Sequence, residues 1–380
     1  REGRRVDAVA CLTKEGGTLL LDRVSGKPIF PFRLRRAPTS TLPGEVTAAY
    51  QPDPVLPEPI SSPEVKLANI TDRTPEAHEF VMRQVQRATY GWFEPPTLGV
   101  PMLYHSSRGG PEWTGGAVDV PTGRLYVSTN HLLSHATVYP LDERERDPKL
   151  PPSRGEQVYG QFCAACHGPK REGLGMVPSL YGLRKRMKDD EVLSLMATGR
   201  NGMPPTPPMP DEDRKALLDF LMRRNQPAPA PLKNSDARYF AVGYKFITDD
   251  EGYPGSKPPW GLLNCIDLNT GKILWRKPLG EYPELTEQGV PKTGTQNFGG
   301  PTVTAGGLVF CAGTRDEMIR AFDADTGEEL WSAKLPFGGY APPTVYEVDG
   351  RQYVVIAATG GGKMGTREGD AYVAFALPAE

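Results

Sequence analysis

The sequence has few cysteines, no long apolar run and little net charge, and each shortage excludes a class of protein. Five cysteines among 380 residues are too few for a scaffold held by disulfides. No stretch approaches the 18 or so apolar residues of a transmembrane helix, so we expect no membrane-spanning segment in this chain. Lysine and arginine number 44 against 46 acidic residues, without a basic block, which argues against a nucleic-acid partner.

Glycine and proline are abundant instead. The chain holds 42 glycines and 40 prolines, well above the average share of these residues. This composition is typical of a turn-rich, mainly β protein and argues against a helical bundle. A length of 380 residues predicts more than one domain. Since the sequence starts at Arg1 rather than at methionine, we expect the natural N-terminus to lie outside it.

A short repeat predicts the fold. Cys265–Trp275 and Ala321–Trp331 share an Asp, a Thr-Gly pair starting three residues later, and a Trp that closes the unit. Leu20–Phe30 and Ala117–Val127 are weaker copies. The Gly supplies the positive φ of a tight hairpin, the Asp can accept hydrogen bonds from the turn, and the aromatic can dock between units. We interpret each copy as a blade signature of a β-propeller, with about four to five blades in this chain.

Two stretches interrupt the strand pattern. Residues 35–97 contain a proline-rich loop and then a predicted helix, with Thr74 as N-cap and Pro75 at its first position. Residues from about 142 to 231 open with a charged run at 142–147 and close with a polyproline-like spacer at 226–231. We therefore divide the chain into propeller blades at 1–147 and 232–380, with an inserted, small all-α domain at 148–231.

The inserted segment contains a haem-attachment motif. Cys163-Ala-Ala-Cys166-His167 is C-x-x-C-H, in which two thiols add to the haem vinyl groups and the histidine ligates the iron. The alternatives are a redox dithiol and half of a zinc site. The first would need a βαβ setting, and the second would need more Cys or His than residues 150–230 contain. We therefore predict covalent haem c.

The surroundings of the motif match this interpretation. A capping box of Ser153 and Glu156 predicts a helix leading into Cys163, and further helices are expected at 189–198 and from Asp211. This order resembles a class I cytochrome c. The second iron ligand is expected to be Met203, on a loop before the last helix, with Met209 as the alternative. Ligation by His and Met suits electron transfer.

Several segments outside the insertion resemble quinoprotein dehydrogenases. They are Val9–Gly26, Gly110–Asp119, Asn297–Phe310 and Gly338–Leu377, and they occur in the order of that family. The nearest branch is the membrane glucose dehydrogenase type, which uses pyrroloquinoline quinone (PQQ). The resemblance implies an eight-bladed propeller in the full-length protein, with PQQ on the axis and Ca²⁺ or another divalent cation beside it. It also implies that a sugar, polyol or alcohol hydroxyl loses its proton to a carboxylate base while hydride passes to the quinone.

The resemblance assigns three residues to the PQQ side, and a fourth is a further candidate. Lys14 corresponds to a lysine at the quinone oxygens, where an ammonium stabilises developing negative charge. Asn130 corresponds to an asparagine beside PQQ and the cation, and its amide oxygen is a suitable Ca²⁺ ligand. Glu112 corresponds to a glutamate near the site, and Asn297 is a further candidate for cofactor contact.

The sequence also departs from the family pattern. The family's aspartate base precedes the lysine strand, so we expect it upstream of Arg1 and assign no catalytic base here. Gly361 stands where the glucose enzyme has a histidine, which argues against glucose as substrate. His105 and His131 receive no predicted role. Cys11, Cys265 and Cys311 are expected to be small buried residues, with a Cys265–Cys311 disulfide as the alternative.

The combined prediction is a periplasmic quinohaemoprotein dehydrogenase, represented by its C-terminal portion. Electrons would pass from PQQ to the inserted haem and on to a soluble cytochrome or a quinone-linked respiratory acceptor. Location outside the cytoplasm follows from covalent haem attachment, and membrane association through an upstream region stays open. The alternative is a non-catalytic propeller scaffold that carries an electron-transfer cytochrome.

Overall fold

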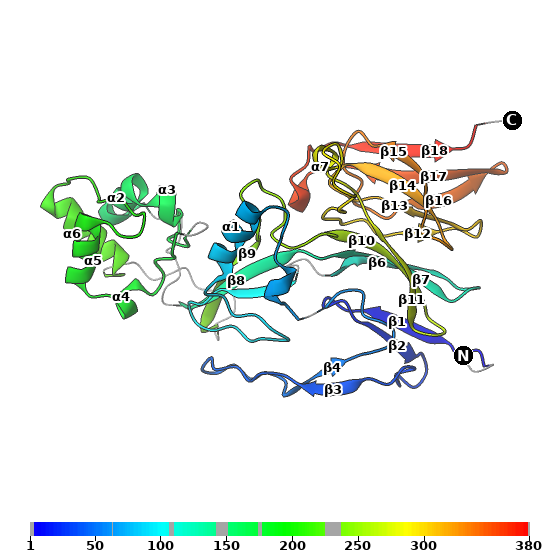
Figure 1. Cartoon of the computed structure of the whole chain (residues 1–380), viewed down its shortest axis with the longest axis horizontal. Coiled ribbons are helices and arrows are strands. Elements are labelled where there is room, and N and C mark those ends of the chain that lie inside the picture. Colours follow the sequence, from blue (N-terminus) through cyan, green and yellow to red (C-terminus); the bar gives the residue numbers. More distant parts are fainter. Residues whose placement is uncertain are drawn as a thin grey trace.

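The computed structural model describes residues 4–62, 64–105, 110–141, 151–173, 177–224 and 237–378, without the side chains of 112–114. Antiparallel sheets make up the larger body, and a group of helices forms a lobe at one end of it (Figure 1). None of the described helices has the length and apolar character needed to cross a bilayer. The predicted charged run and polyproline spacer lie outside the described residues.

Four of the described sheets are propeller blades or parts of blades, so the predicted propeller architecture is confirmed. Two sheets have four strands, one has three and one has two. The two-stranded sheet pairs β1 (Ala8–Leu12) with β2 (Thr18–Asp22). The first complete blade contains β6 (Pro111–Asp119), β7 (Arg124–Asn130), β10 (Gly261–Asp267) and β11 (Lys272–Pro278). The second contains β12 (Thr302–Val303), β13 (Leu308–Cys311), β14 (Met318–Asp323) and β15 (Glu329–Lys334). The last sheet contains β16 (Thr344–Val348), β17 (Arg351–Ala358) and β18 (Ala371–Ala376).

The interpretation of every repeat copy as a separate blade is wrong for two of them. β7 pairs with β10 in the strand order β11-β10-β7-β6, although more than a hundred residues separate the two strands. The copy at Ala117–Val127 therefore forms the hairpin between the first two strands, and the copy at Cys265–Trp275 joins the last two strands of the same blade. The error arises because an Asp-x-x-Thr-Gly turn closes any tight antiparallel hairpin, wherever it lies in a blade.

The tryptophans of the repeat dock between blades, as expected. The Trp275 indole N–H donates to the Ala324 carbonyl of the next blade at 3.1 Å. The ring also packs beside Tyr126, with the centroids 5.9 Å apart. Cys265 and Cys311 lie in this same apolar cluster, buried and unbridged. The prediction for Cys11 is wrong, because this side chain is exposed on the two-stranded sheet.

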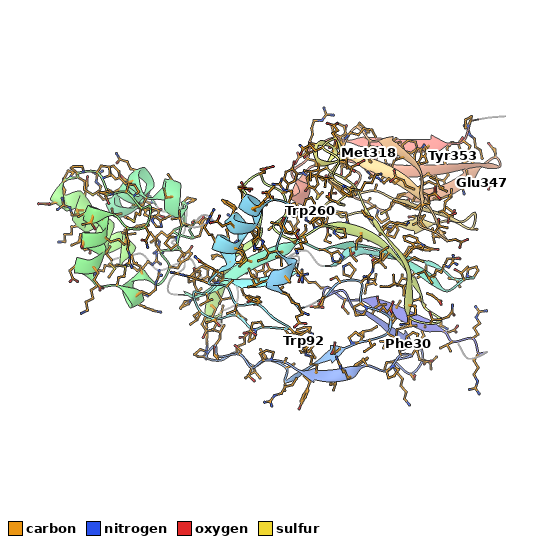
Figure 2. All side chains as sticks on the ribbon, viewed as in Figure 1. Phe30, Trp92, Trp260, Met318, Glu347 and Tyr353 are labelled. Carbon is orange, nitrogen blue, oxygen red and sulfur yellow. The ribbon has the colours of Figure 1, made fainter. Side chains whose placement is uncertain are left out.

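The chain between β7 and β10 adds a further sheet beside the blades. β5 (Met102–His105) pairs with β8 (Leu133–Pro140), which pairs with β9 (Tyr239–Phe246). After β9 the chain turns back through Trp260, which is labelled in Figure 2. The buried ring of Trp260 stacks on Tyr253 and meets Tyr282 edge-on. The indole N–H of Trp260 donates to the Ser256 carbonyl at 2.6 Å, which fixes the return to β10.

The stretch predicted as loop and helix contains more structure than expected. It begins with a hairpin of β3 (Arg33–Arg36) and β4 (Tyr50–Asp53), which sequence analysis did not predict. A single turn of 3-10 helix follows at Leu67–Asn69. The predicted helix is present as α1 (Pro75–Val85), and the Thr74 hydroxyl accepts from the Ala77 N–H at 3.1 Å. Short helical turns also occur at α7 (Pro283–Thr286) and at Gly362–Met364.

The helical lobe is inserted between β8 and β9. Its helices are α2 (Arg154–Phe162), α3 (Ala164–His167), α4 (Leu183–Arg186), α5 (Asp189–Thr198) and α6 (Asp211–Leu221). The three longer helices match the predicted ones, and the Ser153 hydroxyl caps α2 by accepting from the Glu156 N–H at 3.2 Å. α2 and α6 pack through a separate apolar core that includes Val158, Tyr159 and Leu217. The lobe therefore has its own hydrophobic core.

Candidate functional site

The residues predicted to face PQQ come from three connections of the propeller. Lys14 lies in the turn between β1 and β2, Asn130 ends β7, and Asn297 lies between β11 and β12. Connections that follow alternate strands of an antiparallel blade lie at the same end of it. The topology therefore brings these residues toward one face of the propeller. The fourth candidate, Glu112, has its side chain outside the described part of the structure.

A continuous chain of hydrogen bonds joins the three connections. The Gly110 N–H donates to the Lys14 carbonyl at 2.8 Å, and the Asn130 N–H donates to the Gly110 carbonyl at 2.7 Å. The Asn130 amide then pairs with the backbone of Asn297, accepting from its N–H and donating to its carbonyl, both at 2.9 Å. The Lys14 side chain is exposed on this face. Two blades and the turn before them are thereby fixed relative to one another.

The two asparagines have different roles in this arrangement. Asn130 is buried, and its amide oxygen already accepts the Asn297 backbone N–H. Asn297 is also buried and donates its side-chain N–H to the Thr129 carbonyl at 3.1 Å. The amide oxygen of Asn297 has no hydrogen-bond partner among the described residues. An orphan oxygen of this kind suits a donor group or a hard cation, so Asn297 fits a cofactor or cation contact better than Asn130 does.

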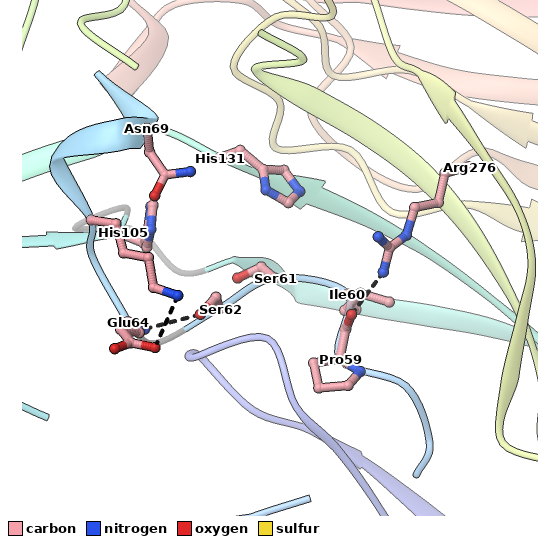
Figure 3. Close-up of a pocket in the computed structure, with 10 residues that line it drawn as sticks. Pro59, Ile60, Ser61, Ser62, Glu64, Asn69, His105, His131 and Arg276 are labelled. Atoms are coloured by element: carbon pink, nitrogen blue, oxygen red, sulfur yellow. Dashed lines mark hydrogen bonds and ion pairs between the residues drawn. The ribbon is translucent and has the colours of Figure 1, made fainter. Parts of the chain in front are cut away.

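A polar pocket of about 370 Å³ adjoins this group (Figure 3). The described residues that line it are Pro59, Ile60, Ser61, Ser62, Glu64, Lys66, Asn69, His105, His131 and Arg276. The Ser61 hydroxyl donates to the Glu15 carbonyl at 3.3 Å, which places the pocket directly beside the Lys14 turn. Sequence analysis missed this pocket, because most of its wall comes from the 35–97 stretch, which matches no motif.

The haem motif lies at the end of α2 and in α3, and a backbone carbonyl holds its histidine. His167 is buried, and its Nδ1 lies 3.0 Å from the Pro178 carbonyl, so Nε2 is the ring nitrogen left for iron. Burial raises the pKa of the Cys163 thiol to about 11, and Cys166 adds to this effect. A redox-active dithiol needs a lowered thiol pKa, so this environment argues against that alternative. Cys163, Cys166 and His167 therefore fit covalent haem c.

The methionine candidates differ in their surroundings. Met203 is half-buried and closes a tight turn, where its N–H donates to the Arg200 carbonyl at 2.9 Å. The Arg200 N–H in turn donates a hydrogen bond to the Met203 carbonyl at 3.0 Å. Met209 instead packs against the apolar core of the lobe. Met203 stays the predicted iron ligand, since its side chain is not part of that core.

An aromatic group joins the lobe to the sheet that carries it. Tyr181, in the loop after Pro178, lies 4.5 Å from Tyr139 of β8 and 5.6 Å from Phe240 of β9, between ring centroids. Tyr139 and Tyr181 are both buried. The side of the lobe that carries the His167–Pro178 contact is thus the side that packs against β8 and β9.

Known proteins resemble the chain over nearly all of its length. It is 30% identical to the glycerol dehydrogenase large subunit of Gluconobacter thailandicus, over 99% of this chain and 44% of that protein. It is 42% identical to the quinoprotein glucose dehydrogenase of Escherichia coli, over 33% of this chain and 17% of that protein. The quinohemoprotein alcohol dehydrogenase of Comamonas testosteroni matches in structure with a TM-score of 0.42 and 17% identity, over 97% of this chain and 35% of that one. The chain thus spans less than half the length of these relatives.

Two family models match. The model described as the glucose/ethanol/alcohol dehydrogenase beta-propeller domain, with the label PQQ, matches residues 1–176 and 191–354. The model described as cytochrome c oxidase, cbb3-type, subunit III, matches residues 151–221, which contain the haem motif. The chain therefore belongs to the family of PQQ-dependent quinoprotein dehydrogenases, and it carries a cytochrome c domain between two strands of the sheet beside its propeller blades.

Proposed function

We propose that this chain is part of a quinohaemoprotein dehydrogenase that oxidises a hydroxyl group of a sugar, polyol or alcohol. The observation that carries the proposal is the hydrogen-bonded chain from Lys14 through Gly110 and Asn130 to Asn297. It joins three of the four residues predicted to lie on the PQQ side. The glycerol dehydrogenase large subunit, which aligns with nearly the whole chain, supports a polyol substrate.

PQQ, when bound, supplies the acceptor for the two electrons of the oxidation. On this face Lys14 offers an exposed ammonium, which would stabilise negative charge on an adjacent oxygen. Asn297 offers a buried amide oxygen with no partner among the described residues, which would hold a donor group or a divalent cation. The group that accepts the hydroxyl proton is not assigned among these residues.

The haem lobe is the proposed next electron carrier. His167 and Met203 would hold the iron, and Cys163 and Cys166 would hold the porphyrin through thioether bonds. From there electrons would pass to a soluble cytochrome or a quinone-linked respiratory acceptor. Covalent haem attachment supports a periplasmic location.

The test uses the full-length protein loaded with PQQ and Ca²⁺. We expect an artificial acceptor to be reduced when a polyol, sugar or alcohol is added, and the haem absorbance to change to the reduced form in the same reaction. Oxidation of substrate without haem reduction would show that the proposed electron route is wrong. Failure to oxidise any hydroxyl compound, despite bound PQQ, would overturn the enzymatic proposal.

The second candidate is a propeller scaffold that only carries the cytochrome. It is favoured by the role of Asn130, whose amide joins two connections without any cofactor. PQQ binding separates the two candidates. A scaffold would bind no PQQ at micromolar concentration, whereas the enzyme would bind it and would carry an aspartate upstream of the Lys14 strand.

A further inference from the structure

Arg171 is a fully buried arginine in the haem lobe. It follows His167 by four residues, and 0% of its surface is exposed, although arginine is rarely buried in this way. Its guanidinium lies over two aromatic rings, 5.3 Å from the Tyr181 centroid and 5.5 Å from the Phe220 centroid. The faces of such rings attract a cation. Because a guanidinium always carries its charge in proteins, a positive charge is held inside the lobe.

The chain between His167 and Arg171 forms a tight loop. The Arg171 N–H donates to the Gly168 carbonyl at 3.1 Å. The Gly173 N–H donates to the carbonyl of His167, the proposed iron ligand, at 2.8 Å. The Tyr159 hydroxyl donates to the Gly168 carbonyl at 2.6 Å, so helix α2 holds the same loop. Arg171 therefore has a defined place close to the proposed ligand.

The carbonyl of Arg171 also holds the segment that contacts the histidine ring. It accepts from the Leu180 N–H at 2.9 Å and from the Ser179 hydroxyl at 3.2 Å. Both donors follow Pro178, whose carbonyl lies 3.0 Å from Nδ1 of His167. The backbone of Arg171 is thus joined to both partners of the contact between His167 and Pro178.

The backbone conformation of Arg171 is a second, independent observation. Its φ of 64° lies in the left-handed region, which residues with a Cβ avoid and which glycine adopts freely. An arginine at this position therefore strains the backbone, where a glycine would not. A strained residue of this kind is evidence that its side chain has a function.

A buried positive charge acts strongly on a redox centre beside it. Reduction adds one electron to the haem, so a nearby cation stabilises the reduced form relative to the oxidised form. Water and salt screen an exposed charge, but they screen a buried charge much less. Lys170 carries the same charge in the same loop and is exposed. The carboxylate of Glu172 accepts from the Lys170 backbone N–H at 2.7 Å.

We propose that Arg171 raises the reduction potential of the haem by holding its positive charge inside the lobe, beside the loop of His167. The inference rests on the haem ligation of the proposed function and adds a residue that tunes this electron carrier. A higher potential makes the haem a better acceptor for electrons from the dehydrogenase part. Arg171 acts on the haem through its charge, so it is not a catalytic residue.

The test measures the haem potential of Arg171→Met in the full-length protein, with haem attached and without substrate. Methionine has a Cβ and a long side chain, so this variant removes the charge without relieving the backbone strain. In a spectroelectrochemical titration, the equilibrium should shift about 10-fold toward oxidised haem, a decrease of about 59 mV for one electron. Lys170→Met is the matched control and should shift it less than 2-fold. An unchanged potential in Arg171→Met, or an equal decrease in both variants, would overturn the inference.

Arg171→Lys separates charge from packing and keeps the inference testable if the methionine variant fails to fold. Lysine retains a positive charge but lacks the planar guanidinium. At pH 6 its haem equilibrium should stay within 2-fold of wild type, whereas a 10-fold shift toward oxidised haem would contradict a role of the charge. If the wild-type chain carries no covalent haem, the proposed function fails. If haem is attached and Arg171→Met keeps the wild-type potential, only the tuning role of Arg171 fails.

Discussion

The haem lobe and the propeller part assemble their sites in opposite ways. The haem ligands Cys163, Cys166 and His167 lie within one turn of chain, between α2 and the end of α3. The proposed PQQ face takes Lys14, Asn130 and Asn297 from three distant connections. A local site needs only its own segment to fold, whereas the distributed site exists only when neighbouring blades are joined. The two sites should therefore respond differently to the same kind of substitution.

The largest effect is expected at the haem. Replacing both Cys163 and Cys166 by alanine should abolish covalent haem attachment, because no thiol of the motif remains to form a thioether. Haem staining of the denatured chain measures this directly. Cys265→Ala, which changes a buried cysteine of a blade, should keep full haem content. Haem that stays attached in the double variant would disprove the assignment of the motif.

The next effect concerns the PQQ face alone. Lys14→Ala should lower kcat of the PQQ-loaded, full-length enzyme by about 100-fold, because a charge-stabilising group is lost from the reacting oxygen. The haem spectrum should not change. Lys27→Ala is the control, since Lys27 is an exposed lysine that lies shortly after the end of β2. A Lys14 variant with normal kcat would remove the lysine from the proposed site.

The third effect tests how far the distributed site depends on blade contacts. Asn130→Ala removes both bonds to Asn297 and leaves a buried N–H and carbonyl unpaired, so we expect a loss of about 2–3 kcal/mol in unfolding free energy of the propeller part. Urea titration followed by tryptophan fluorescence measures it, while haem absorbance should report an unchanged lobe. Asn269→Ala, at an exposed turn, should cost less than about 1 kcal/mol. Simultaneous loss of both signals would mean that the two parts unfold as one unit.

The smallest effect lies where the two parts touch. A double-mutant cycle of Tyr139→Ala and Tyr181→Ala should give a coupling free energy of about 1 kcal/mol, the usual range for an aromatic pair. The cycle is measured by chemical denaturation. Tyr181→Ala paired with Trp331→Ala, whose ring contacts Phe375 instead, should show no coupling. Zero coupling for the tyrosines would show that this ring pair does not help to hold the lobe against the sheet.

Local patterns predicted the haem lobe in more detail than the propeller. Caps and spacing gave α2, α5 and α6, because helix starts are determined by nearby residues such as Ser153. The hairpin turns were also predictable, yet their assignment to blades was not, since pairing of β7 with β10 depends on contacts across the intervening insertion.

The candidate site shows the same limit. Lys14 and Asn130 were identified by resemblance to a family, and the pairing of Asn130 with Asn297 appears only in the folded chain. His105 and His131 meet in one polar pocket, most of whose other lining residues come from 59–69, a stretch with no motif. No spacing rule connects these positions, so the pocket cannot be predicted from the sequence.

The pairing of Pro140 with Tyr239 shows how the cytochrome domain is attached to the sheet. Because the chain leaves β8 and returns to β9 at directly opposed positions, about 5 Å apart, the whole cytochrome occupies the place of a hairpin loop. A short turn in its place would still close the β5-β8-β9 sheet, and a different electron carrier could be fused between the same two strands. The cytochrome domain is thus attached at a single pair of opposed strand ends, and Tyr139 and Phe240 are the residues beside this junction that a replacement domain would have to cover.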